Sequence, residues 1–421
     1  MSRSIRSLGS LVAVIALVAV ACGDPAAGDE PAPGAGAVVT SEVKTATEGG
    51  TGLDPTDPTD PTDTTATASG FPSALDDRDH PDFPPPLIDT SGILSGGPPP
   101  DGIPPIDDPA FVPVETADGY LADGEPVVIL DIEGDVRAYP VQVLIWHEIV
   151  NDTVGGVPVS VTYCPLCNSA VSYRREVRGE VTTFGTSGLL FNSALVMYDR
   201  ASESLWTHFD GKAVVGALTG EVLEPIGSPL LSWGDFKATY PDGQVLDRDR
   251  TGHSRSYGTN PYAGYDDPDG IPFLFRGVAD DRAREMQRVV GIAVGDEALA
   301  YSLDALASDA GFASVEATVG GQDVVIFWAA GQSTALESGG IADGRDIGSV
   351  GVFVPAIDGE SLVLTASAAG FTDAATGSLW TVTGLAVEGP LAGSQLERIP
   401  HLDTFWFAWS TYRPGTLLIE Q

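Results

Sequence analysis

Beyond about position 76, hydrophobic residues recur mainly with a period of two, which is the pattern of half-buried β-strands. In residues 157–164, valine and tyrosine alternate with proline, serine and threonine. Residues 193–198 and 205–209 are largely apolar and flank a short polar turn that begins at Asp199, so they predict a hairpin. Frequent glycines separate further short apolar runs. The pattern therefore predicts a chain dominated by short antiparallel strands.

A helical pattern interrupts the strands at two similar places. Val141 to Val150 is apolar nearly all round, and Pro140 suits the first position of a helix, so we expect a short buried helix there. Ser302 suits the N-cap of a matching helix further along the chain. The fold class predicted from these patterns is α+β and β-rich.

The chain also resembles itself. The stretch "YDRASESLW" at 198–206 matches "TDAATGSLW" at 372–380, and "TVGG" at 153–156 recurs at 318–321. The matches keep the same order in both copies. We therefore expect two homologous domains from an internal duplication, each built mainly of antiparallel strands with one short buried helix.

These patterns divide the chain into five predicted segments. They are a lipoprotein signal peptide (1–21), a disordered Pro/Thr/Asp-rich tether (22–75), a first β-rich repeat with a Cys/His site (76–226), a connecting segment (227–284) and a second, degenerate repeat (285–421).

The N-terminus predicts export. Arg3 and Arg6 precede the apolar run Leu11 to Val20, which is too short to span a bilayer as a mature helix. Small residues then lead to Cys22, which resembles the lipobox of bacterial lipoproteins, whose cysteine is lipidated. We expect an exported chain, anchored to the bacterial cell envelope through lipid on Cys22. An ordinary cleaved secretory signal is the alternative.

The charge balance argues against nucleic acid as a partner. Aspartate and glutamate number 59 against 21 lysines and arginines, for a net charge of −38. A chain this acidic is repelled by phosphate backbones. We read the acidic residues as a solvated surface, and the charge names no protein partner or substrate.

Two cysteines lie three residues apart, directly after the strand predicted at 157–164. The second copy lacks both, and it lacks the histidine and the methionine found in the corresponding parts of the first copy. Groups that are absent together are candidates for acting together. The candidate site comprises Cys164, Cys167, His147 and, as a fourth member, Met197.

Several long motifs resemble those of an uncharacterised bacterial family, domain of unknown function 3179. They are "WHEIVND" (146–152), "TYCPLCNSA" (162–170), "LVMYDR" (195–200), "YGTNPY" (257–262) and "FWFAW" (405–409). The resemblance extends from the end of the tether onward and implies no established activity. The family's association with selenoproteins favours redox chemistry at Cys164 or Cys167, if selenocysteine replaces one of the pair in relatives. We expect His208 to be a different polar residue in relatives, and therefore not a ligand.

Three functions fit the cysteine pair. The first is a soft transition-metal site, because thiolate, imidazole and thioether donors select copper(I) or zinc. The second is an extracytoplasmic thiol–disulfide oxidoreductase with Cys164 and Cys167 as its catalytic residues and His147 lowering a thiol pKa. The third is a surface binding module with a structural disulfide, although so short a loop gains little stability from a crosslink. The metal site is our leading hypothesis.

Two further stretches favour structural roles. Residues 248–270 mix arginine, histidine, asparagine and tyrosine, as a binding loop over a pocket does, but any long polar loop has this composition and we expect no site there. The aromatic run at 405–409 predicts a core strand.

Overall fold

The computed structural model describes residues 70–420. The predicted signal peptide, the proposed lipidation site Cys22 and most of the predicted tether lie outside this range. Ser73 and Ala74 are already buried, and the Ala74 amide donates a hydrogen bond to the Glu203 carbonyl. The folded body therefore begins a few residues before the predicted boundary at position 76. Among the described residues, every helix is too short or too polar to cross a bilayer.

Short antiparallel sheets make up most of the body, which confirms the prediction of a β-rich chain. The first half of the body contains three sheets, ordered β15-β3-β4-β16-β2, β14-β7-β6-β5 and β1-β10-β11-β12-β13. The strands of the first sheet are β2 (Phe111–Pro113), β3 (Pro126–Ile132), β4 (Asp135–Pro140), β15 (Leu230–Ser232) and β16 (Gln244–Leu246). Those of the second are β5 (Ile149–Val154), β6 (Val157–Cys164), β7 (Ser169–Arg174) and β14 (Pro225–Ile226). Those of the third are β1 (Ile93–Ser95), β10 (Phe184–Phe191), β11 (Ala194–Asp199), β12 (Leu205–Thr207) and β13 (Lys212–Val215).

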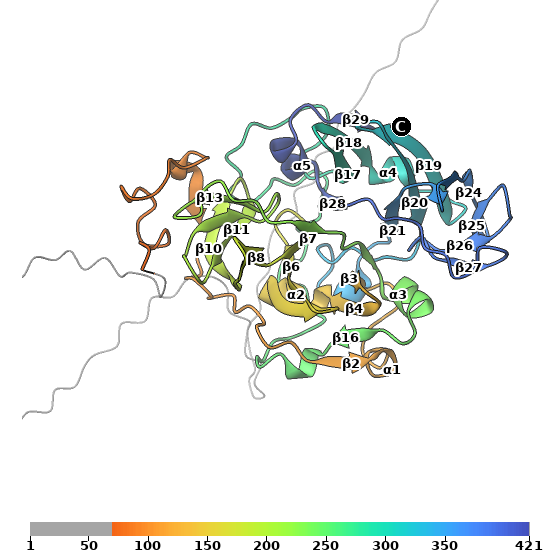
Figure 1. The fold of residues 1–421 in the computed structure, drawn as a ribbon, viewed down its shortest axis with the longest axis horizontal. Coiled ribbons are helices and arrows are strands. Elements are labelled where there is room, and N and C mark those ends of the chain that lie inside the picture. The colour runs from red at the N-terminus through yellow and green to blue at the C-terminus, as the bar shows by residue number, and fades with distance from the viewer. Residues whose placement is uncertain (1–69, 421) are drawn as a thin grey trace, which may run out of the picture. The chain divides into compact units, whose positions relative to one another are not determined.

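The second half contains three sheets of similar order, β28-β17-β18-β29, β19-β20-β21 and β24-β25-β26-β27. Figure 1 shows them in blue-green and blue, gathered away from the yellow and green strands of the first half. Their strands are β17 (Arg288–Val294), β18 (Glu297–Ser302), β19 (Phe312–Val319), β20 (Gln322–Ala329), β21 (Ser349–Phe353), β24 (Leu364–Ser367), β25 (Gly370–Asp373), β26 (Leu379–Trp380), β27 (Ala386–Glu388), β28 (His401–Phe405) and β29 (Leu417–Ile419). Two small hairpins, β8 (Glu176–Val177) with β9 (Glu180–Val181) and β22 (Ala356–Ile357) with β23 (Glu360–Ser361), complete the strands.

The two halves close their leading sheets in the same way. β15, α3 (Trp233–Thr239) and β16 follow one another in the chain, and β16 joins β4 as a parallel neighbour. β28, α5 (Trp406–Tyr412) and β29 follow the same path, with β29 parallel to β18. Residues 230–232 and 244–246 of the predicted connecting segment therefore belong to the first sheet.

The strand predicted at 405–409 is wrong, because all but its first residue belongs to helix α5. Trp406 and Trp409 are both buried, and they lie three residues apart on one side of that helix. The aromatic run fills the core as expected, but it does so with helical spacing. Since a run of aromatic residues is buried in either conformation, composition alone did not decide between them.

Tight hairpins also recur at matching points. β5 and β6 are joined by Gly155 and Gly156, and β19 and β20 by Gly320 and Gly321, all four with positive φ angles. A side chain on Gly155 would meet the Ile132 carbonyl oxygen, and one on Gly320 would meet a carbonyl oxygen at the end of β17. Only glycine fits such positions, which explains why "TVGG" occurs twice.

The first predicted helix is shorter than expected. Helix α2 (Val141–His147) begins after Pro140 and ends where Glu148 adopts a left-handed conformation, with φ of 57°. Strand β5 begins at the next residue, so the chain turns sharply at Glu148. In the second half, α4 (Leu303–Leu306) has Ser302 at its N-cap position as predicted, but without a side-chain capping bond. A further short helix, α1 (Val114–Ala117), follows β2.

Candidate functional site

The cysteine pair lies in a short hairpin loop inside the core. Cys164 is the last residue of β6, Ser169 is the first of β7, and the two are cross-strand partners. Cys167 and Asn168 complete the turn, with Asn168 at a φ of 47°. No helix begins at Cys164, so the loop lacks the helix N-terminus that acidifies the first cysteine of thioredoxin-like proteins.

Hydrogen bonds from distant segments fix this loop. Tyr163 donates its hydroxyl to the side-chain oxygen of Asn168 at 3.0 Å, which holds the turn. The Cys167 carbonyl accepts bonds from the Thr404 hydroxyl at 2.6 Å and from the Phe405 amide at 3.2 Å. Because Tyr163 holds the loop from within and residues 404–405 hold it from far along the chain, the loop backbone has little freedom to move.

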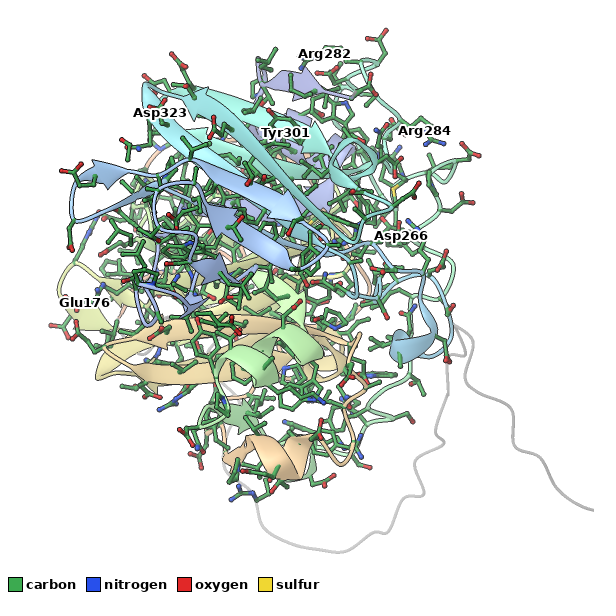
Figure 2. The ribbon with its side chains drawn as sticks, turned by 90° about the vertical axis from the view of Figure 1, so that its right-hand side faces the viewer. Glu176, Asp266, Arg282, Arg284, Tyr301 and Asp323 are labelled. Atoms are coloured by element: carbon green, nitrogen blue, oxygen red, sulfur yellow. The ribbon has the colours of Figure 1, made fainter. Side chains whose placement is uncertain are left out.

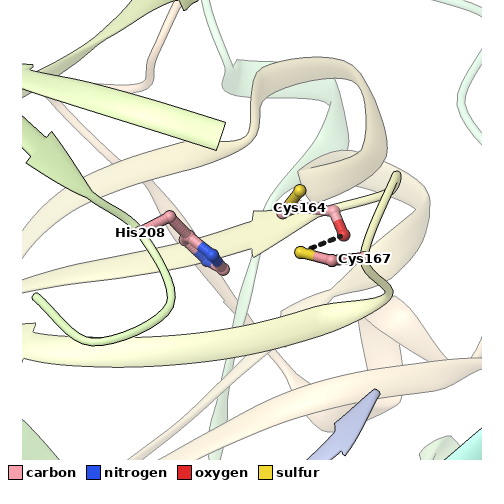
Figure 3. Close-up of side chains that lie close together, drawn as sticks. All are labelled: Cys164, Cys167 and His208. Atoms are coloured by element: carbon pink, nitrogen blue, oxygen red, sulfur yellow. Dashed lines mark hydrogen bonds between the residues drawn. The ribbon is translucent and has the colours of Figure 1, made fainter. Parts of the chain in front are cut away.

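His208 is the third member of the cluster (Figure 3). The two sulfur atoms and one ring nitrogen of His208 all lie within 4.8 Å of one another, and all three residues are buried. Among the histidine, cysteine, aspartate and glutamate side chains of residues 70–420, these three form the one group close enough to share an ion. The sequence-based expectation that His208 is not a ligand is therefore not supported, because the turn after β12 brings it directly to the cysteines.

The backbone of β11 ties His208 to Cys164. The Leu195 amide donates a hydrogen bond to Cys164 Sγ at 3.4 Å, and the Leu195 carbonyl accepts one from the His208 amide at 3.1 Å. Ser169 Oγ lies 2.9 Å from Cys167 Sγ and 3.5 Å from His208 Nδ1. The remaining ring nitrogen, Nε2, is buried and has no hydrogen-bond partner among the described residues. An unpaired buried nitrogen is costly, so it invites a ligand.

The two thiols differ in acidity. Burial raises the pKa of Cys167 well above its usual value, and the neighbouring Cys164 adds to the effect. Burial acts on Cys164 in the same direction, but hydrogen bonds from Cys167 and from the Leu195 amide outweigh it, so the pKa of Cys164 is lowered. Cys164 is therefore the more acidic of the two thiols and the one that loses its proton first. Both cysteines are free in the structure.

Burial also keeps His208 neutral. It lowers the pKa of the imidazole to about 3. A neutral imidazole retains the nitrogen lone pair that binds a metal ion. The cluster thus offers two buried thiols of different acidity and one neutral imidazole.

His147 does not belong to this cluster. Its Nδ1 lies 2.7 Å from the Pro104 carbonyl oxygen, and its Nε2 lies 2.7 Å from the Tyr257 hydroxyl. Both ring nitrogens are therefore already hydrogen bonded, and the predicted role of His147 as a ligand is not supported. Met197 is fully buried in the same core cluster as both cysteines, and its role as a fourth ligand stays a prediction.

Glu148, the residue after His147, was not predicted as a site residue. It lies near enough to Cys164 for the two charges to interact. It is 7 % exposed, and burial raises the pKa of its carboxyl group to about 8, with the charge of Cys164 adding to the shift. It also lines a cavity of about 490 Å³, together with Leu166 and Leu195 from the surroundings of the cysteines. A buried carboxyl group with a strongly shifted pKa in a cavity is a typical feature of a functional site.

Comparison of the two halves contains a signal for both residues that sequence reasoning missed. Two residues after the matching tryptophans, His208 of the first half corresponds to Val382 of the second. Counted back from the matching glycine hairpins, Glu148 corresponds to Ala313. The second half therefore lacks these groups as well as the cysteines. Extending the alignment by these few positions identifies them.

The protein is thus a β-rich protein of short, mainly antiparallel sheets with a buried Cys–Cys–His cluster. Residues 100–416 match the family described as protein of unknown function (DUF3179), and the chain belongs to that family. The match confirms the resemblance drawn from the sequence motifs. Comparison with curated proteins and with solved structures finds no match.

Proposed function

We propose that Cys164, Cys167 and His208 bind one soft transition-metal ion, either copper(I) or zinc. The observation that carries the proposal is a buried cluster of two free thiols and one ring nitrogen of His208, all within 4.8 Å of one another, in a histidine whose Nε2 is unpaired among the described residues. Thiolate and imidazole donors select these metals over magnesium and calcium, which prefer oxygen.

The spacing of the donors suits a single ion. An ion about 2.0–2.3 Å from each donor needs the donors roughly 3.5–4 Å apart. The three ligand atoms already lie within 4.8 Å of one another, so small side-chain rotations suffice. Cys164, the more acidic thiol, would lose its proton first, and Cys167 would release its proton on binding as well. Ser169 Oγ, beside both Cys167 Sγ and His208 Nδ1, would orient the two ligands.

The number of donors favours copper(I). Structural zinc sites almost always have four protein ligands, and the cluster supplies three from histidine and cysteine. A thioether from Met197 would complete a set of soft donors, which also favours copper(I) over zinc. Zinc remains the alternative, since its charge would be balanced by two thiolates.

Metal content of the purified chain and its variants tests the proposal. We expect about one equivalent of copper or zinc in the wild-type protein by mass spectrometry after anaerobic purification, as a single three-donor site requires. Cys164→Ser, Cys167→Ser and His208→Asn each remove a donor, and each should lose the metal. His147→Gln is the matched control, because it alters a buried histidine whose nitrogens are hydrogen bonded elsewhere. It should keep the metal.

Two outcomes would contradict the proposal. One is metal retained in His208→Asn, and the other is a metal-free wild-type protein in which both thiols react on unfolding. Thermal unfolding of each variant on the same samples separates metal loss from misfolding.

Thiol–disulfide exchange is the second candidate, and the close approach of two free thiols in one short loop is the observation that favours it. A low-pKa thiol beside a high-pKa thiol suits an attacking and a resolving cysteine. Metal-free protein that reacts with oxidised glutathione, forming one Cys164–Cys167 disulfide and two molecules of reduced glutathione, would support this function. A count of free thiols on the unfolded protein, made before and after glutathione treatment, measures the loss of both cysteine thiols.

We also infer that the two halves arose by duplication. The shared sheet order and the paired glycine hairpins support this reading. Export and lipid anchoring through Cys22 belong to the same proposal, supported by the N-terminal sequence.

A further inference from the structure

A mainly apolar cavity lies one layer of side chains away from the cysteine cluster. It has a volume of about 490 Å³, within the range of small-molecule sites. Leu195, whose amide bonds to Cys164 Sγ, forms part of its wall, and so does Leu166 from the cysteine loop. Tyr262 and Tyr265 close it from residues 248–270, the segment in which we expected no site.

The mouth of this cavity is also apolar. Ile271 is 81 % exposed and Phe273 is 49 % exposed, and both line the cavity. Large apolar side chains at a cavity entrance favour ligands with an apolar body, because binding removes their surfaces from water.

Glu148 is the charged group that lines the cavity. Its side chain is more than nine-tenths buried, and no hydrogen bond to its carboxyl group is found among residues 70–420. The described lining contains no lysine, arginine or histidine to balance it. A buried carboxyl group without a partner favours its neutral form, and a cation bound beside it would stabilise the ionised form.

We infer that this cavity binds a small organic cation, an ammonium group on an apolar body, with Glu148 as the counter-ion. The ammonium would donate hydrogen bonds to the carboxylate, and the rings of Tyr262, Tyr265 and Phe273 surround the space for the rest of the molecule. The net charge of −38 raises the local concentration of cations and opposes anions. The inference goes beyond the proposed metal site and does not depend on it.

Three probes of one shape test the inference: 4-phenylbutylamine, 4-phenylbutanol and 4-phenylbutyrate. Calorimetric titration of the full chain at a pH of about 8 should show the amine binding at least about tenfold more tightly than the alcohol, as expected for a charge-assisted hydrogen bond. The carboxylate should not bind. Glu148→Gln should weaken the amine at least about tenfold and leave the alcohol unchanged.

Two variants control this experiment. Glu176→Gln removes a carboxylate that projects from the surface (Figure 2), so it should leave amine binding as in the wild type. Phe273→Ala removes a half-exposed ring at the entrance and should weaken the amine and the alcohol alike. Cys167→Ser abolishes the proposed metal site and should leave the preference for the amine intact.

The inference is overturned if the amine and the alcohol bind wild-type protein equally, if no amine binding is detected, or if the amine preference survives in Glu148→Gln. If Glu148→Gln does not fold, as judged by thermal unfolding, equal binding of amine and alcohol to Phe273→Ala overturns it instead.

Discussion

A single left-handed residue places a carboxyl group in the interior. Glu148 ends helix α2, and its positive φ turns the chain directly into β5. A non-glycine residue in this conformation costs free energy, so other interactions of the folded protein must offset that cost. Here the conformation directs the side chain toward the cavity and the cysteine cluster.

The raised pKa of Glu148 predicts a pH dependence of stability. Burial raises this pKa to about 8, whereas a glutamate in the unfolded chain titrates near about 4.3. Between these values the folded state retains a proton that the unfolded state has released. The free energy of unfolding therefore falls as pH rises, by up to about 1.4 kcal/mol per pH unit from this residue.

Glu148→Gln should remove that slope. Relative to the wild type, the variant should gain stability steadily from about pH 5 to about pH 8, the window set by the two pKa values. Urea unfolding at several pH values measures the difference, with the surface variant Glu176→Gln as control. Parallel stability curves for wild type and Glu148→Gln would show that the carboxyl group titrates normally in the folded protein.

At the scale of elements, the two halves build the same turn with the same hydrogen bonds. Asp199 accepts bonds from the Ser202 and Ser204 amides at 2.7 and 3.2 Å and from the Trp206 indole at 3.0 Å. Asp373 accepts the equivalent indole bond, from Trp380, at 3.2 Å. Each carboxylate is buried and joins the end of one strand to the start of the next.

Removing either carboxylate should therefore destabilise the protein. Asp199→Ala leaves the Ser202 amide and the Trp206 indole N–H buried without an acceptor, and we expect a loss of about 2–4 kcal/mol. Asp373→Ala should cost a similar amount because its partners are the same kinds of group. Chemical denaturation measures both, with the exposed residue Asp309→Ala as control. A loss below about 1 kcal/mol in both variants would mean that water replaces the carboxylate.

The strands were predictable because alternation and glycine turns are local. Strand β6 and the hairpin of β11 and β12 around the turn at Asp199 match the predictions, because both follow from residues close in the chain. The identity of the third cluster member was not local. His208 reaches the cysteines only because β11 lies between them and bonds to both, and this pairing is invisible in a period of two.

At the scale of the whole molecule, a buried ion-pair network joins segments that are far apart in the chain. Arg288 of β17 has a 5 % exposed side chain and pairs with Asp266 at 2.9 Å and with Asp403 of β28 at 3.0 Å. Asp266 also pairs with Arg345 at 2.9 Å. Asp266 (Figure 2) lies in the segment that carries Tyr262 and Tyr265. The network therefore holds the cavity wall against the second half.

Breaking the network should be costly. Arg288→Met leaves two buried carboxylates without their main cation, and we expect a loss of about 3–5 kcal/mol of unfolding free energy. Arg284→Met is the control, because Arg284 forms an exposed pair with Asp269 and should change stability by less than about 1 kcal/mol. Chemical denaturation compares the two variants, and equal losses would show that the buried pairs add no more than a surface pair.

The hydrogen bonds from Thr404 and Phe405 to the Cys167 carbonyl affect when, during synthesis of the chain, the cysteine loop can reach its final conformation. Thr404 leaves the ribosome 237 residues after Cys167. Throughout that interval the loop with both cysteines has been synthesised, and His208 follows it after about 40 residues. The hydrogen-bond donors that fix the loop conformation are still missing. A fragment that stops before β28 contains all three proposed ligands but lacks the hydrogen bonds from Thr404 and Phe405 that hold the cysteine loop. If the cluster binds metal as proposed, we therefore expect the site to form only after β28 has been synthesised, because β28 supplies the donors that fix the cysteine loop.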